Sequence, residues 1–152
     1  MKKLAAVLIP LVLVGMAACK SQPPPPPPPT PVPATPTPPP PPSVGMVTLG
    51  NAIGADKKVT APSDAFHAKD TIYASVDTAG VGPTKLRALW TFVKGDKTAK
   101  VDESTLEFEA SGPATNEFHI AKPSGWPKGD YRVEVFLNDG AAPAMTKTFK
   151  VS

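Results

Sequence analysis

Few side chains in this 152-residue chain are of a type and spacing that could carry out chemistry. Glu107 and Glu109 stand two residues apart, so in a strand they would share one face, about 6.6 Å apart. Paired carboxylates of this kind can cleave glycosides as acid and base when both face a cleft. Here they alternate with Leu106 and Phe108, which makes them the outward residues of a strand. We interpret the pair as an exposed acidic edge, which also discourages pairing between sheets.

Metal-binding and nucleophilic signals are equally sparse. His67 and His119 have no neighbouring cysteine and form no His-x-His pair, so we expect both to be solvated and predict no metal site. Ser104, Ser111 and Ser124 lack the Gly-x-Ser-x-Gly setting of a hydrolase, and no glycine-rich phosphate loop is present. We therefore predict no catalytic residues, no bound cofactor and no enzymatic activity.

The loop over 121–129 holds the one aromatic side chain suited to ligand contact. Trp126 lies between two prolines, with Lys122 and Lys128 on either side. The indole could stack on a sugar or a peptide while the two lysines meet an anion. Alternatively, Trp126 folds down as a plug over the end of the core. The sequence favours the plug and leaves Trp126, Lys122 and Lys128 as weak candidates for ligand contact.

A second loop, over 94–100, carries three lysines and one aspartate. We expect a solvated hairpin tip, with contact to anionic lipid head groups or glycan as the alternative. The segment Asn138-Asp139-Gly140 is typical of a hairpin turn, because Asn and Gly tolerate positive φ.

The segments that must position these loops are short, and in most of them apolar and polar residues alternate with period two. Each is bounded by Gly, Pro, Asn or Asp, and outside the first eighteen residues no window has helical periodicity. The segment over 85–93 is apolar on both faces, which predicts a central strand. The expected strands span 46–53, 71–78, 85–93, 105–110, 117–121, 131–137 and 145–151.

Seven strands in about 110 residues predict an all-β, antiparallel sandwich of two sheets. Gly129-Asp130-Tyr131 resembles the start of the penultimate strand in immunoglobulin and fibronectin type III domains, where a tyrosine bonds back to the preceding corner. Trp90 resembles their core tryptophan, whereas the bridging cysteine pair of antibody domains is absent. The resemblance is therefore to the architecture. The expected core is Trp90, Phe92, Phe118, Tyr131, Val133, Val135 and Phe149.

The first eighteen residues have the layout of a secretory signal. Lys2 and Lys3 give a positive start, an apolar run follows over 4–14, and small residues precede Cys19. The run is too short to span a bilayer as a helix.

The segment Met16-Ala17-Ala18-Cys19 resembles the lipobox of bacterial lipoproteins, with Met16 where that family more often has Leu. The resemblance implies cleavage before Cys19, a diacylglycerol on its sulfur and an acyl chain on its new amine. Lys20, in place of Asp, implies transport to the outer membrane, on its periplasmic or surface face. The alternative is an ordinary secretory leader with a cysteine near the cut.

A proline-rich linker follows the cysteine. Fifteen of the twenty residues over 23–42 are proline, which can build neither helix nor sheet. As polyproline II at about 3.1 Å per residue, this stretch would be a semi-rigid rod on the order of 60 Å long. We interpret it as a spacer; a ligand for a proline-reading groove is the alternative.

The formal charge of +3 comes from residues before the folded part. Lys2, Lys3 and Lys20 account for three of the 16 basic residues, which leaves 13 basic against 13 acidic residues from Ser43 onward. A neutral domain lacks the excess of positive charge that nucleic-acid binding requires. With the only cysteine lipidated, no disulfide can form, so the core alone must hold the domain together.

Together these features predict a lipoprotein signal peptide over 1–18, a lipidated cysteine and linker over 19–42, and an immunoglobulin-like sandwich over 43–152. The expected function is non-catalytic binding of a protein partner in the cell envelope. A purely structural spacer, or a module that binds peptidoglycan or another glycan, remains the alternative. The sequence does not indicate the oligomeric state.

We predict that Cys19→Ala leaves the protein unprocessed or soluble. Each buried methylene contributes about 0.8 kcal/mol, so two or more acyl chains anchor stably and their loss releases the chain. Detergent phase partitioning of cell extracts measures this, and unchanged partitioning of the variant would contradict the anchor.

Overall fold

The computed structural model describes residues 37–152 of the chain, so the predicted signal peptide, Cys19 and most of the proline-rich stretch lie outside the described residues. Within 37–152 the chain forms strands and no helix, so this part holds no helix able to cross a membrane. The strands are β1 (Ser43–Gly50), β2 (Ala65–Phe66), β3 (Ile72–Ala79), β4 (Val81–Lys94), β5 (Lys97–Ser111), β6 (Ala114–Ile120), β7 (Gly129–Leu137) and β8 (Met145–Val151).

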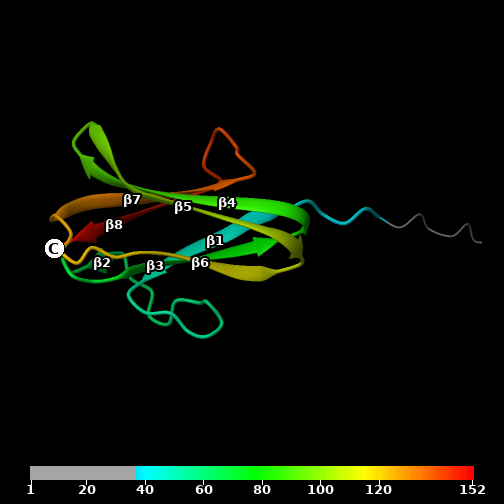
Figure 1. The fold of residues 1–152 in the computed structure, drawn as a ribbon, viewed down its shortest axis with the longest axis horizontal. Helices are drawn as coiled ribbons and strands as arrows, with labels where there is room; N and C mark the ends of the chain where they lie inside the picture. The colour runs from blue at the N-terminus through cyan, green and yellow to red at the C-terminus, as the bar shows by residue number, and fades with distance from the viewer. Residues whose placement is uncertain (1–36) are drawn as a thin grey trace, which may run out of the picture. The chain divides into compact units, whose positions relative to one another are not determined.

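The strands form two sheets packed face to face, as Figure 1 shows. One sheet has the order β1-β3-β6 and the other the order β2-β8-β7-β4-β5. Every pairing is antiparallel except the short parallel pair of β2 with β8. Apart from the short β2, one sheet holds β1, β3 and β6 and the other holds β4, β5, β7 and β8. This division of seven strands between two sheets is an immunoglobulin-like arrangement. The predicted all-β sandwich is confirmed.

The core comes from the period-two alternation of the central strands. Most inward apolar residues of β3, β4 and β7 are at most 1% exposed, because their neighbours on both sides and the facing sheet cover them; Phe92 and Leu137, near strand ends, are half-buried. β4 lies between β7 and β5, as its two apolar faces predict. Six of the seven expected core residues belong to the core cluster, and the seventh, Phe92, is half-buried and packs against it.

Several strands differ in extent from the sequence prediction, and one strand was not predicted. β5 runs over Lys97–Ser111, well beyond the expected 105–110. Its first half is mostly polar and gives no alternating signal in the sequence, but its backbone still pairs with β4. β2 was not predicted, since a two-residue parallel pair with the end of β8 leaves no periodicity. The first strand begins at Ser43 and has a register shift between Val44 and Val47.

The end of the proline-rich stretch packs against the domain. The carbonyl oxygen of Pro40 accepts a hydrogen bond of 3.0 Å from the backbone N–H of Val81, at the β3–β4 turn. Gly80 in that turn has φ of 103°, and a β-carbon there would overlap the backbone of Pro41 and Pro42. The sequence assigns the prolines over 38–42 wholly to the linker. In the structure their backbone contacts attach them to the domain at a fixed point beside β4.

We expect Gly80→Ala to destabilise the domain more than Gly82→Ala does. Both glycines have positive φ, so each alanine stores strain of about 1–3 kcal/mol. A β-carbon at Gly82 meets nothing within 4 Å, whereas one at Gly80 pushes Pro41 away and costs about 1–3 kcal/mol more. Urea unfolding of the two variants measures the difference, and equal losses would mean that the proline contact does not form.

Candidate functional site

The loop over 121–128 is held in place by Tyr131, the third residue of β7. Its hydroxyl donates a hydrogen bond of 2.7 Å to the carbonyl oxygen of Pro127, as the resemblance to a tyrosine corner implies. The ring stacks on Phe149 with centroids 5.3 Å apart and contacts Phe92 at 4.9 Å. Burial raises the pKa of the Tyr131 phenol above its usual value, which keeps the donating proton in place.

Trp126 packs inward at the end of the sandwich. Its side chain belongs to the core cluster and the residue is only 6% exposed. The indole N–H donates 2.9 Å to the carbonyl oxygen of Asp70, and the backbone N–H donates 2.6 Å to that of Ala68. The ring meets Tyr131 edge-on at 6.2 Å. The packing agrees with a plug over the core, and a role in ligand contact stays a prediction.

The two lysines of the loop are both exposed, although they differ in setting. The Lys122 ammonium lies 6.0 Å from the centre of the Trp126 ring, at the outer limit of a cation–π contact. Lys122 also lines a groove that Lys128 does not reach.

This groove, called the Trp126 groove below, encloses about 520 Å³. One wall comes from β5, the other from the end of β6 and the loop after it, and the floor from β4 and β7. Its lining residues are Phe92, Lys100, Val101, Asp102, Ile120, Ala121, Lys122, Trp126, Pro127 and Tyr131. The groove therefore opens on the side of the sandwich between the edge strands β5 and β6.

Asp102 lines this groove from β5, next to a β-bulge at Val101. Trp90 pairs with Asp102, and the next residue of β4, Thr91, pairs with Lys100, so Val101 is an extra residue. Because opposite residues share a face and Trp90 is fully buried, Asp102 occupies an inward position of β5. Its carboxylate is nevertheless exposed, since the facing sheet does not extend over it. Asp102 is in phase with Leu106 and Phe108, and it was missed from the sequence because the expected strand begins only at residue 105.

Lys100, on the same wall, is engaged elsewhere. Its ammonium donates a hydrogen bond to Glu103, which also lies 3.4 Å from the Arg87 guanidinium. The Lys100 hydrogen bond is the main reason why the pKa of the Glu103 carboxyl lies below its usual value. Lys100 thus contributes its aliphatic stem to the groove and its charge to the outer face of β5.

The acidic pair that could have cleaved glycosides lies on an exposed edge. Glu107 and Glu109 project from β5, the last strand of its sheet, and both are exposed. Glu107 pairs with Lys85, which also donates to Asp139 at 3.2 Å. The hydrogen bond from Lys85 to Asp139 is the main cause that raises the pKa of Lys85.

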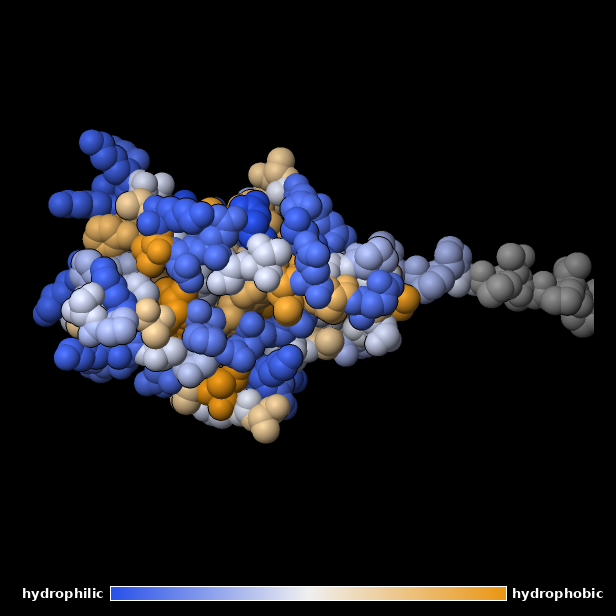
Figure 2. Space-filling model, viewed as in Figure 1, coloured by the Kyte–Doolittle hydropathy of each residue, from blue (hydrophilic) through white to orange (hydrophobic). Residues whose placement is uncertain are grey.

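The remaining candidate residues are separate surface groups. His67 is exposed beside Asp70, and His119 pairs with Glu117 at 2.8 Å on the outer face of β6. The 94–100 loop forms an exposed hairpin tip between β4 and β5, which projects from the molecule in Figure 2. Over residues 37–152, no three His, Cys, Asp or Glu side chains come together to hold a metal ion.

Comparisons with known proteins give remote likenesses. No family model matches the chain, and no curated protein matches it. An immunoglobulin-like protein from Pseudomonas aeruginosa is 17% identical, with a TM-score of 0.46 over 73% of this chain and 96% of that one. A β-glucosidase involved in saponin metabolism from intestinal bacteria is 14% identical, with a TM-score of 0.46 over 74% of this chain and 16% of the enzyme. These likenesses assign no family.

We predict that Trp126→Ala lowers the free energy of unfolding by about 3–5 kcal/mol, the usual cost of emptying a buried aromatic site. Thermal unfolding followed by circular dichroism measures the loss. Lys128→Ala is the matched control on the same loop and should cost less than about 0.5 kcal/mol. Unchanged stability of Trp126→Ala would argue against the plug.

Proposed function

We propose that the chain is a lipoprotein of the cell envelope that displays a non-catalytic, immunoglobulin-like binding module. Cys19 carries the lipid, the proline-rich stretch acts as a spacer, and the sandwich binds a protein partner. Lys20, in place of Asp after Cys19, favours anchoring in the outer membrane, on its periplasmic or surface face.

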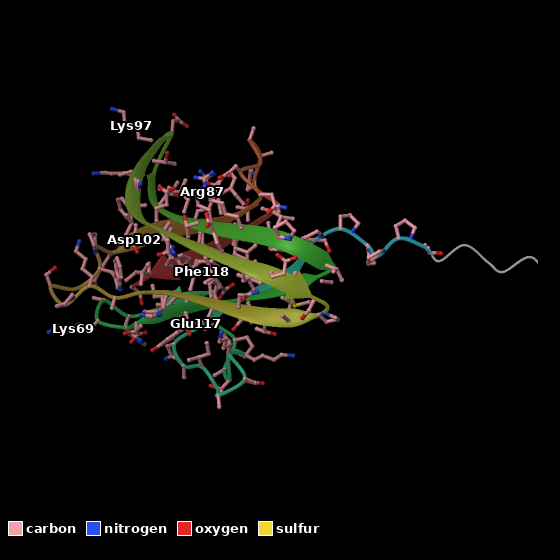
Figure 3. The ribbon with its side chains drawn as sticks, turned by 45° about the vertical axis from the view of Figure 1, so that its right-hand side comes forward. Lys69, Arg87, Lys97, Asp102, Glu117 and Phe118 are labelled. Atoms are coloured by element: carbon pink, nitrogen blue, oxygen red, sulfur yellow. The ribbon has the colours of Figure 1, made fainter. Side chains whose placement is uncertain are left out.

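The main support is the position of the Trp126 groove relative to the prolines. The prolines meet the domain at Val81, the first residue of β4, whereas Phe92 in the groove floor lies eleven residues further along that strand. At 3.3 Å per residue the two points are about 36 Å apart. In Figure 3, Asp102 and Lys97 lie at the end of the domain away from the Thr37–Pro42 segment. A module held by its prolines would thus present the groove outward.

A protein partner fits the groove better than a glycan does. Sugars are commonly bound on an exposed aromatic face, and the indole and phenol rings here are buried. A spacer with no ligand is the second candidate, because apolar side chains on the described surface are few: Met46 and Val81 are its only large exposed apolar residues.

The test is photo-crosslinking in intact cells. A photoreactive amino acid replaces Lys122 in the groove wall or, as the matched control, Lys147 on β8. We expect a discrete protein adduct from position 122, none from position 147, and loss of the adduct when Cys19→Ala removes the anchor. No adduct, or equal adducts at both positions, would favour the spacer, and a muropeptide adduct would favour glycan binding.

A further inference from the structure

We propose that the Trp126 groove binds a short extended peptide in which an apolar side chain is flanked by one basic and one acidic residue. This inference rests on the proposed function and specifies the chemistry of the protein partner. Three features of the groove support it: opposite charges on facing walls, an apolar floor and an adjacent free strand edge.

The two walls carry opposite charges. Asp102 stands on the β5 wall and Lys122 on the wall that follows β6. Within the described part of the chain, neither forms an ion pair, although Lys100 and Glu103 nearby are paired. The groove therefore offers a carboxylate and an ammonium to a ligand, which calls for a cation near Asp102 and an anion near Lys122.

The groove surface between these charges, formed by the floor and the lower walls, is apolar. Phe92 and Val101 are half-buried, and Ile120 completes the surface beside them. Half-buried apolar side chains gain stability when a ligand removes their remaining surface from water. An aliphatic side chain placed between the two charged walls would do this.

The strand edge favours an extended peptide over a compact ligand. β5 is the last strand of its sheet, so backbone groups along its outer side are open to a partner. The bulge at Val101 and the inward charge of Asp102 interrupt that edge and oppose continuous sheet pairing. The contact is therefore short, with side chains rather than a long strand ladder providing specificity.

The experiment uses three capped peptides and the full-length chain in detergent micelles. Acetyl-Lys-Leu-Glu-amide and acetyl-Glu-Leu-Lys-amide have the same composition in opposite order, and acetyl-Gln-Leu-Gln-amide is the neutral control. Amide chemical shifts in NMR spectra at low salt report binding. We expect one charged peptide to shift Val101, Asp102, Ala121 and Lys122 with Kd on the order of 1 mM, and the neutral peptide to bind roughly two- to fivefold more weakly.

Exchanging the wall charges gives the sharpest test. In the double variant Asp102→Lys with Lys122→Asp, the preferred order of the two charged peptides should reverse. Lys128→Gln, on the same loop outside the groove, should leave both affinities unchanged. Both exchanged residues are exposed, so the double variant keeps the core intact.

The inference is overturned if the neutral peptide binds as well as the charged ones, if the exchange does not reverse the preference, or if no peptide shifts these resonances. It is also overturned if chitotetraose shifts them and no peptide does. A protein adduct at position 122 in cells together with failure of the peptides would leave the proposed function standing and remove only this inference.

Discussion

The contacts of Tyr131 are the interaction on which the end of the sandwich depends. The ring lies between Phe149 and Phe92 inside the core, while its hydroxyl reaches out to Pro127. One side chain therefore connects the packed sheet to a loop that has no strand of its own. Trp126 then closes the core end against that ring and hydrogen-bonds the β2–β3 connection through Asp70. This link and the hydrogen bonds of Trp126 together fix the position of the 121–128 loop.

The Trp126 groove follows from that fixed loop and from the bulge in β5. The loop sets one wall, and the extra residue Val101 forms the other together with Asp102, which is at an inward position of β5. The same bulge and inward carboxylate interrupt the free edge of β5, and Lys147 at an inward position does so on β8. Features that oppose aggregation between sheets thus also provide the charges available for recognition.

The fold also determines which end of the domain lies away from the attached prolines. Pro40 bonds to the start of β4, and Gly80 leaves room for the backbone of Pro41. Because adjacent strands alternate in direction, the loop with Trp126 and the β4–β5 hairpin fall at the opposite end of the domain (Figure 1).

The sequence by itself determined the two-sheet class, the inward faces of β3, β4 and β7, and the corner formed by Tyr131. Each of these depends on local alternation or on a residue type at a turn, which the chain order displays. The tertiary structure decided which side chains form the groove. Asp102 and Lys122 are twenty residues apart, and the bulge that adds Val101 beside Asp102 reflects the pairing of β5 with β4 and leaves no periodic signal. The hydrogen bond between Pro40 and Val81 is likewise a contact between backbone groups far apart in the sequence, and the pattern of side chains does not predict such a contact.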